Sequence, residues 1–352
     1  MSLTTVDAGL LGTQAQYTGF KNRIINGAMV IDQRNAGASG TAINYTIDRF
    51  GYYGTQASKG TWQQNAGSVT PPAGFKNYLG FTSSSAYSVL STDVFQFYQP
   101  VEGYNVADLG WGAAGAATVT LSFWVRSSLT GTFGGSVSNN GSTRNYPFTY
   151  TISAANTWQQ NTVTIAGDTT GTWLTTNGSG LVVLFGLGAG SSYSGTANTW
   201  NGTSAAIFPT GATSVVGTNG ATFYITGVQL EAGTTASPFE YRQYGTELAL
   251  CQRYYQQLGS FVGGSGGTTT TVYTSFQYPV TPRATPTFAQ SGVFSVSNPA
   301  VNAYTQSSVS VTTSTSNAFG AFLQFGNFSG MNSQQVHFKT ADGSYLAISA
   351  EL

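Results

Sequence analysis

Side chains able to do acid–base or nucleophilic chemistry are scarce in this sequence. His337 is the only histidine and Cys251 the only cysteine, so a Ser/His or Cys/His arrangement would need His337, and a zinc cluster would be short of ligands. Alternation in QVHFKT predicts a strand on which His337 is exposed or at an interface. Asp93, Glu102 and Asp108 gather in the sequence and could supply the two carboxylates that glycoside cleavage needs.

Two other carboxylates have an arginine close by, Asp32 with Arg34 and Asp48 with Arg49. Ion pairing within the fold explains both more simply than catalysis does. Cys251 falls on the apolar side of a predicted helix, which favours a place in a core over a nucleophilic role. We therefore expect a protein that is not an enzyme, with a depolymerase built on the acidic group as the alternative.

Aromatic side chains in polar loops are the candidates for sugar binding. Aromatic faces stack on pyranose rings, and Asn, Gln and Ser bond the hydroxyls. Trp124 and Trp158 lie in strand-like segments and are expected in cores, whereas Trp173 in GTWLTTNGSG and Tyr193 and Trp200 in GSSYSGTANTWNGTS lie in loop-like ones. We predict a carbohydrate site at these last three, and the alternative is that their loops pack on a neighbouring subunit.

The composition restricts the class of partner. Charged residues make up 7% of the 352 residues, aromatic residues make up 14%, and the formal net charge is zero, whereas an ordinary soluble domain is roughly 25% charged. Without a Lys/Arg cluster, the electrostatic part of nucleic-acid affinity is missing, and we exclude that partner. Neutral partners, such as sugars or other copies of the chain, are expected.

The sequence predicts neither export nor membrane insertion. The opening MSLTTVDAGLLG lacks a basic leader and a sufficient apolar run, and no stretch approaches the ~18 to 20 apolar residues of a membrane span. With one cysteine, no internal disulfide is possible. We expect synthesis and folding in a cytoplasm.

Short alternating runs separated by Gly, Asn and Ser turns fill residues 21–242 and predict a β-sandwich or barrel. LVVLFGLG, residues 181–188, is apolar throughout and predicts a strand covered on both faces. The apolar phase slips at Gly227, which predicts a β-bulge. Four apolar side chains share one face of the strand ATVTLSFWVRSS: Val119, Leu121, Phe123 and Val125.

A helix is predicted over residues 243–259, between the sandwich and a smaller C-terminal β domain at 260–352. Its apolar stripe would pack on its own sandwich or form a symmetric contact between chains. The first twenty residues, 1–20, form a predicted attachment arm. Spacings of four, three, four and three place five side chains on one side of the helix: Tyr244, Leu248, Cys251, Tyr255 and Leu258.

Five motifs resemble those of a family of phage and prophage tail proteins. They are NRIINGAMVIDQRN, YTIDRF, LSFWVRSS, TWQQNTVTI and GVQLEAGTTASPFEYRQYGTELALCQRYYQ, in that order from Asn22 to Gln257. The resemblance implies the antiparallel jelly-roll β-sandwich of carbohydrate-binding modules, and thus an all-β protein with a short linking helix. It also implies a component of the virion, usually multimeric.

The resemblance leaves two functions open. One is a tail-fibre or receptor-binding subunit, a homotrimer as in many fibres, which contacts other virion proteins through its arm and touches polysaccharide on the host surface. The other is a purely structural virion protein: a decoration, adaptor or head-fibre subunit. No cofactor is expected, although jelly rolls of this kind often carry a structural calcium, for which Asp32, Asp168 or Glu231 could supply oxygen ligands.

Overall fold

The computed structural model describes residues 20–259, 264–268, 270–297, 303–306, 311–317, 319–328, 335–340 and 343–352. The chain divides into two compact units, the first ending at Glu247 and joined by Leu352, the second comprising Leu248–Glu351. Except for Phe20, the predicted arm lies outside the described residues, and so does the side chain of His337.

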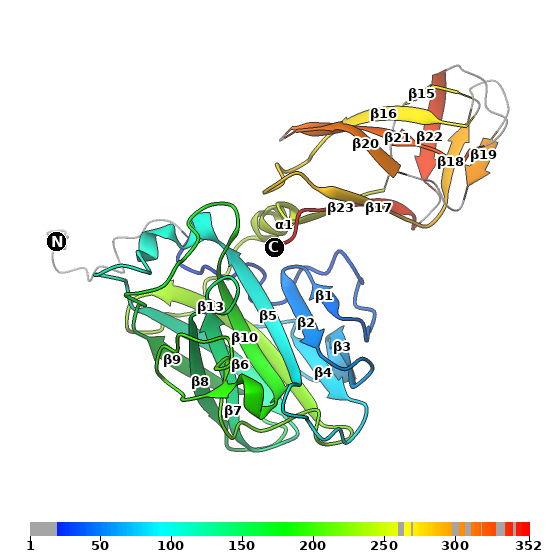
Figure 1. Cartoon of the computed structure of the whole chain (residues 1–352). Helices are drawn as coiled ribbons and strands as arrows, with labels where there is room; N and C mark the ends of the chain where they lie inside the picture. The colour runs from blue at the N-terminus through cyan, green and yellow to red at the C-terminus, as the bar shows by residue number, and fades with distance from the viewer. Residues whose placement is uncertain are drawn as a thin grey trace, which may run out of the picture. The chain divides into compact units, whose positions relative to one another are not determined.

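Two antiparallel sheets form the first unit (Figure 1). The six-stranded sheet has the order β1 (Asn44–Ile47), β2 (Phe50–Gly54), β5 (Val94–Glu102), β10 (Ser179–Ala189), β7 (Gly131–Ser138) and β8 (Asn145–Ile152). The five-stranded sheet has the order β3 (Gly60–Gln64), β4 (Leu79–Ser83), β13 (Thr222–Ala232), β6 (Val119–Ser127) and β9 (Gln159–Ile165). From β5 onward the chain passes repeatedly from one sheet to the other, as in a jelly roll, so the predicted all-β sandwich is confirmed.

The sandwich core is built by the alternation visible in the sequence. Val119, Leu121, Phe123 and Val125 of β6 are all buried, as expected for one face of that strand. Phe123 packs against Phe185 of the opposite sheet with ring centroids 5.0 Å apart. Such aromatic pairs add roughly 0.5–1.5 kcal/mol to the free energy gained from area burial.

The β-bulge predicted in β13 is confirmed. The register between β13 and β6 shifts between Thr226 and Gln229, and Gly227 has a φ of +62°. This left-handed conformation favours glycine, because a Cβ there is strained. The bulge returns Val228 and Leu230 to the buried face, where the phase slip of the sequence requires them.

The segment between β10 and β13 folds back over the outer face of the six-stranded sheet. It contains the short parallel pair β11 (Ser194–Gly195) and β12 (Phe208–Pro209). The ring of Phe208 lies so close to Gly186 of β10 that a Cβ there would be 3.0 Å from it. Strand β10 is thus covered over most of both faces, as its continuous apolar run predicted.

The described residues of the second unit form two further sheets after the end of α1. One has three strands, in the order β14 (Tyr255–Leu258), β23 (Tyr345–Ser349) and β17 (Thr287–Ser291). The other has seven: β19 (Ala303–Gln306), β18 (Phe294–Ser297), β22 (Gln335–Thr340), β15 (Gly264–Gly266), β16 (Val272–Gln277), β21 (Gly320–Phe325) and β20 (Val311–Ser316). Apolar side chains such as Leu323, Phe325 and Ile348 form its own buried core.

The predicted helix over 243–259 is wrong in its second half. Helix α1 covers only Tyr244–Gln252, and Tyr255 and Leu258 belong to strand β14, which pairs with β23. Cys251 and Tyr255 are buried, and Leu258 packs on the core of the second unit. The five predicted interface residues therefore do not form one exposed helical stripe, and of them Tyr244 alone is exposed.

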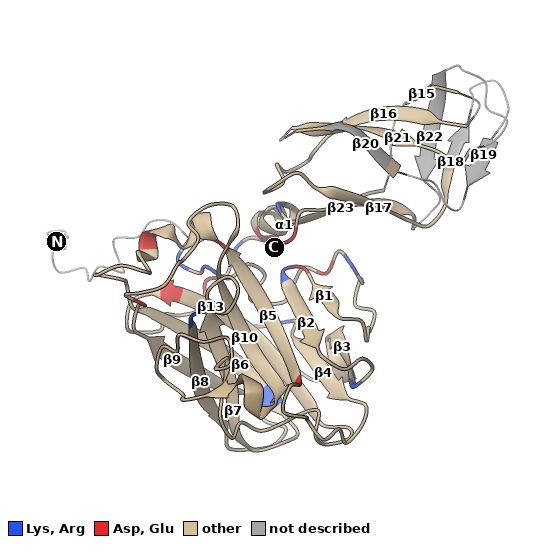
Figure 2. Cartoon of the chain, in the orientation of Figure 1, with Lys and Arg blue, Asp and Glu red and all other residues tan. Residues whose placement is uncertain are grey.

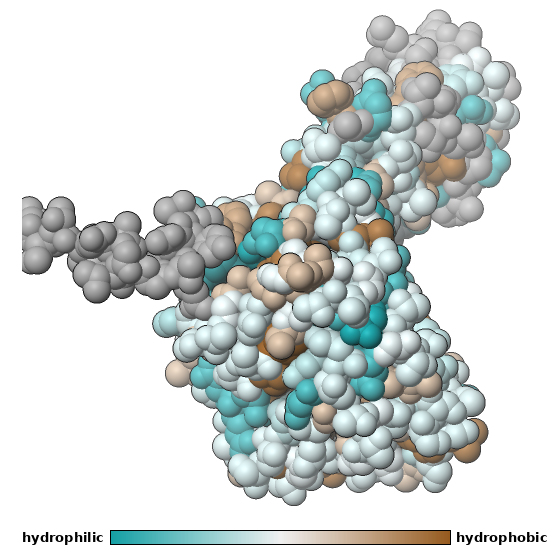
Figure 3. All heavy atoms as spheres, turned by 60° about the vertical axis from the view of Figure 1, so that its left-hand side comes forward, coloured by the Kyte–Doolittle hydropathy of each residue, from teal (hydrophilic) through white to brown (hydrophobic). Residues whose placement is uncertain are grey.

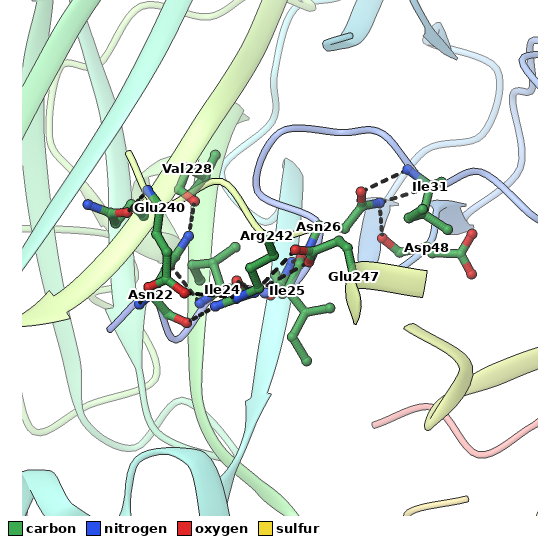
Figure 4. A network of polar contacts seen from close by, with 12 residues as sticks. Asn22, Ile24, Ile25, Asn26, Ile31, Asp48, Val228, Glu240, Arg242 and Glu247 are labelled. Atoms are coloured by element: carbon green, nitrogen blue, oxygen red, sulfur yellow. Dashed lines mark hydrogen bonds and ion pairs between the residues drawn. The ribbon is translucent and has the colours of Figure 1, made fainter. Parts of the chain in front are cut away.

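A buried polar network, here called the N-terminal clamp, fastens residues 21–26 to the sandwich (Figure 4). Arg242 is at its centre and donates hydrogen bonds to the carbonyl oxygens of Asn22 and Ile24. Its guanidinium also pairs with Glu240 at 3.2 Å and Glu247 at 3.4 Å. The side chains that make the clamp are Asn22, Gln99, Glu240, Arg242 and Glu247.

Side chains of the clamp satisfy most backbone N–H groups of the segment. Glu240 Oε2 accepts hydrogen bonds from the N–H groups of Lys21 and Asn22 at 2.7 and 2.9 Å, and Glu247 accepts one from Asn26. Gln99 bonds both the N–H and the carbonyl of Ile25. The segment is thus held without a sheet ladder, by residues that lie in the motifs or on β5.

Candidate functional site

A groove of about 190 Å³ opens on the outer face of the six-stranded sheet. The turn between β7 and β8 forms one wall with Asn139, Gly141 and Ser142. In the part of the chain that the structure describes, every residue lining the groove is uncharged. The sheet and the segment above it contribute the remaining lining residues: Tyr53, Gln96, Tyr98, Val182, Leu184 and Ile207.

Strand alternation places these side chains in the groove. On β5, Phe95 and Phe97 point into the core and are buried, so Gln96 and Tyr98 point outward. On β2, Tyr52 is buried and Tyr53 is 41% exposed. The register pairs Gln96 with Tyr53 on one side and with Gly186, which Phe208 covers, on the other.

Tyr98 is held against the sheet by its neighbours. Its ring covers Gly51, where a Cβ would lie 2.3 Å from the ring, so the absence of a side chain makes the contact possible. The ring centroids of Tyr45 and Tyr98 are 6.0 Å apart. The Arg34 guanidinium lies over the ring of Tyr45, 5.0 Å from its centroid. These contacts give the groove a preformed aromatic wall.

Two amide side chains in the groove differ in their hydrogen bonds. Asn139 donates to Thr143 Oγ1 and the Thr172 carbonyl, and it accepts from the Arg144 N–H, so its polar atoms are used within the loop. Gln96 Oε1 is buried and has no hydrogen-bond donor among the described residues.

Two of the three predicted sugar-binding aromatics lie together and are not among the residues that line this groove. Trp173 and Trp200 pack edge-to-face with each other and with Trp111, with centroids 4.7–5.5 Å apart. Their indole N–H groups donate to the carbonyls of Thr170 and Ala166. The arrangement fastens loops to the sandwich and leaves both rings only partly exposed.

Tyr193 lies in a different cluster. Its ring packs with Leu184 and Phe208 on the outer face of the six-stranded sheet, and its carbonyl accepts the N–H of Ile207, a groove residue. The third predicted aromatic is therefore next to the groove, whereas the groove side chains Tyr53, Gln96 and Tyr98 were not predicted.

Asp93 and Asp108, two of the three carboxylates considered for catalysis, make contacts within the fold. Burial alone would raise the pKa of Asp93, but hydrogen bonds from Tyr87, the Leu90 N–H, Thr55 and Gln56 lower it to about 2. Such a carboxylate holds its loops as an anion and is a poor proton donor.

Asp108 pairs with Arg23 at 2.6 Å, and Glu102 is buried at the end of β5.

The three carboxylates considered for calcium also have protein partners. Asp32 accepts the N–H groups of Asn35 and Gly37, and Glu231 accepts hydrogen bonds from Gln229 and Ser237. Asp168 binds the Arg144 guanidinium at 2.6 and 2.7 Å. Burial alone would raise the pKa of Asp168, but this contact and the hydrogen bonds from Thr170 outweigh burial and hold the pKa below its usual value. Among the residues described, no three His, Cys, Asp or Glu side chains are grouped to hold a metal ion.

The surface around the groove is nearly neutral. In the sheet that carries the groove, strands β7, β8 and β10 contain no charged residue (Figure 2). On the face shown in Figure 3, most described residues have intermediate hydropathy, with small hydrophobic and hydrophilic patches between them. Among the described helices, none is long and apolar enough to cross a membrane.

No family model and no curated protein matches the sequence. Among solved structures, the chain is similar to the enzymatically active domain of tailspike protein 4 of bacteriophage CBA120, with 12% identity and a TM-score of 0.33 over 60% of this chain. The similarity spans 21% of the tailspike chain.

It is also similar to two carbohydrate-binding modules. One is of family 4, with 17% identity and a TM-score of 0.29 over 59% of this chain and 98% of the module. The other is the family 11 module of Clostridium thermocellum, with 10% identity and a TM-score of 0.30 over 57% of this chain and all of the module.

Proposed function

We propose that this chain is a non-catalytic, glycan-binding subunit of a bacteriophage particle, a tail fibre or receptor-binding protein, and that the groove is its glycan site. The observation that carries the proposal is the groove itself: two tyrosine rings, amide side chains and uncharged walls on the face of a sheet. Aromatic faces with a few placed hydrogen-bonding groups are what recognition of a pyranose requires.

The placement in a phage particle is supported by the motif resemblance. The five motifs lie in the framework: their residues supply most of the N-terminal clamp, much of the interior strand β6 and the edge strand β9. No groove residue falls within them. The resemblance therefore bears on the scaffold, and the glycan function depends on the groove alone.

This separation also supports a second candidate, a purely structural virion protein. A sandwich of the same framework could serve assembly without any ligand. Adsorption distinguishes the two functions, because only a receptor-binding subunit in isolation should bind host cells and block phage attachment.

The experiment uses the purified full chain and host cells in an adsorption-blocking assay. Tyr53→Ala removes an exposed aromatic face from the groove and should weaken cell binding by about tenfold, since stacking and packing of one ring contribute on the order of 1 kcal/mol or more. The matched control is Tyr104→Ala, a tyrosine that is exposed outside the groove.

An equal loss of cell binding in both variants would contradict the assignment of the groove. A wild-type chain that neither binds cells nor blocks attachment would instead support the purely structural function. New reducing ends in host polysaccharide incubated with the protein would overturn the non-catalytic part of the proposal.

A further inference from the structure

We infer that Asn140 is a site of spontaneous deamidation, a covalent modification that places a carboxylate in the turn that walls the groove. The reaction consumes only water, and it does not depend on the proposed glycan function. The sequence contains five Asn-Gly pairs, which begin at Asn26, Asn140, Asn177, Asn201 and Asn219. The structure distinguishes one of them from the other four.

An Asn-Gly pair hinders this reaction least, because glycine has no Cβ beside the attacking nitrogen. The backbone nitrogen of the glycine bonds to the side-chain carbonyl carbon of the asparagine. The C–N bond of the amide breaks, and ammonia leaves with the proton of the backbone nitrogen. Water then opens the cyclic imide at either of its two carbonyl carbons, which yields aspartate or isoaspartate. A free side-chain amide, a free glycine N–H and a turn that can open therefore favour the reaction.

Asn140 and Gly141 meet these three conditions. Both are exposed in the turn between β7 and β8. Among the described residues, neither the Asn140 side chain nor the Gly141 N–H has a hydrogen-bond partner. Gly141 has a φ of +85°, and a Cβ placed there would meet no heavy atom outside its neighbours within 4 Å. The Ser142 N–H closes the turn by donating to the Asn139 carbonyl at 3.1 Å, and exposed bonds of this kind open readily.

The pair at Asn26 is locked in the core. Its side chain is fully buried. The amide donates to the carbonyls of Ile31 and Asp48 at 2.8 and 2.9 Å and accepts the Ile31 N–H at 2.9 Å. A Cβ on Gly27 would lie 2.1 Å from the Val228 carbonyl oxygen. The imide therefore cannot form at Asn26 without local unfolding.

The other three pairs are restrained by hydrogen bonds. Asn219 is exposed, but Gly220 donates its N–H, the attacking group, to a backbone carbonyl at 2.9 Å. The Asn201 side chain donates to two carbonyls of its own loop. On both sides of Asn177, the backbone carbonyls accept N–H groups of residues 103–104. Exposure alone thus does not select the reactive pair, and the free glycine N–H does.

Deamidation of Asn140 changes the wall of the groove. Its two neighbours, Asn139 and Gly141, line the groove, and every described lining residue is uncharged. Aspartate has a pKa of ~3.9 and is ionised at neutral pH. Isoaspartate carries the same charge and adds a carbon atom to the backbone of the turn. An effect of the modification on ligand binding rests on the proposed function, whereas the modification itself does not.

The test follows the pairs by mass spectrometry. The full chain, folded or unfolded in guanidinium chloride, is incubated at mildly alkaline pH and digested with trypsin at intervals. Cleavage after Lys and Arg separates residues 127–144, which contain Asn140, from residues 24–34, which contain Asn26. Digestion with chymotrypsin resolves the other three pairs. In the folded chain Asn140 should react within about threefold of its unfolded rate, and Asn26 at least about tenfold below its own, because Asn26 reacts only after local opening.

Two substitutions identify the source of the acidic product. Asn140→Gln keeps the amide but moves it one carbon away from the attacking nitrogen, so ring closure is slower. It should remove the first acidic species that ion-exchange chromatography resolves from the aged, folded chain. Asn219→Gln is the matched control, at an exposed asparagine of another Asn-Gly pair, and it should leave that species in place.

Reaction of Asn140 at close to its unfolded rate supports the inference. The inference is overturned if residues 127–144 stay unmodified in the folded chain while they react in the unfolded chain. It is also overturned if Asn219 reacts as fast as Asn140 or faster. Neither result depends on whether the chain binds host cells, so failure of this inference and failure of the proposed function are distinguishable.

Discussion

Replacing Arg242 with methionine should release residues 21–26 from the sandwich. The Arg242 side chain is 3% exposed, and its guanidinium bonds two backbone carbonyls and two carboxylates. Breaking one side of a buried ion pair costs about 3–5 kcal/mol, because the other charge stays buried. The carboxylate contacts are long, at 3.2 and 3.4 Å, and both glutamates retain some exposure, so we expect the lower end, about 3 kcal/mol.

Hydrogen exchange followed by mass spectrometry measures this locally, without assuming that the two units unfold together. A loss of about 3 kcal/mol should speed exchange of the amides of residues 21–26 by about 100-fold, while β6 keeps its protection. Arg126→Met is the control, because that guanidinium bonds a backbone carbonyl at an exposed site. Exchange within about threefold of wild type in Arg242→Met would refute the assignment of the clamp.

A double-mutant cycle tests whether the clamp acts as one unit. Glu247 accepts the Asn26 N–H and pairs with Arg242, so Glu247→Gln should cost less in the Arg242→Met background than in wild type. Full additivity of the two free-energy changes would show that the residues act independently.

Three further predictions concern the framework, each checked by the melting temperature of unit 1. Gly27→Ala would place a Cβ 2.1 Å from the Val228 carbonyl oxygen, which forces the backbone apart and should cost about 2–3 kcal/mol; an unchanged melting temperature would contradict this contact. The pKa of Asp93 is lowered to about 2, so its stabilisation is complete above pH ~4 and is lost between pH ~4 and ~2; Asp93→Asn should flatten that acid limb, and an unchanged limb would refute the assignment. Phe208→Ala empties a buried position and should cost about 3 kcal/mol, whereas a loss below about 1 kcal/mol would show that the covering segment is held elsewhere.

Much of the fold was predictable, because alternation within a strand is local. The buried face of β6, the doubly covered β10 and the bulge at Gly227 follow from the order of apolar and glycine residues. The predicted helix is longer than α1 because the apolar spacing in the sequence continues past Gln252, where α1 ends. Tyr255 instead pairs with Ser349, more than ninety residues away, and no local spacing encodes a partner at that distance.

The candidate site was less predictable. Aromatic residues in polar loops have no evident core in the sequence, yet Trp173 and Trp200 pack together with Trp111. That contact depends on how separate loops meet, which composition does not specify. The signal for the groove was nevertheless present in VFQFYQPVE, where Gln96 and Tyr98 occupy the phase opposite to Phe95 and Phe97. An aromatic on the outward phase of an interior strand indicates a covered or ligand-binding face.

The clamp and the groove are two separate features of the first unit. The clamp joins residues 21–26 to residues 240–247. The two ends of the sandwich sequence therefore lie side by side. The groove lies on the outer face of the sandwich and shares no residue with the clamp. Gln99 and Gln96 show how closely the two approach: both are on β5, three residues apart, with Gln99 buried on the clamp and Gln96 in the groove. Substitutions in the groove are therefore expected to leave the clamp intact.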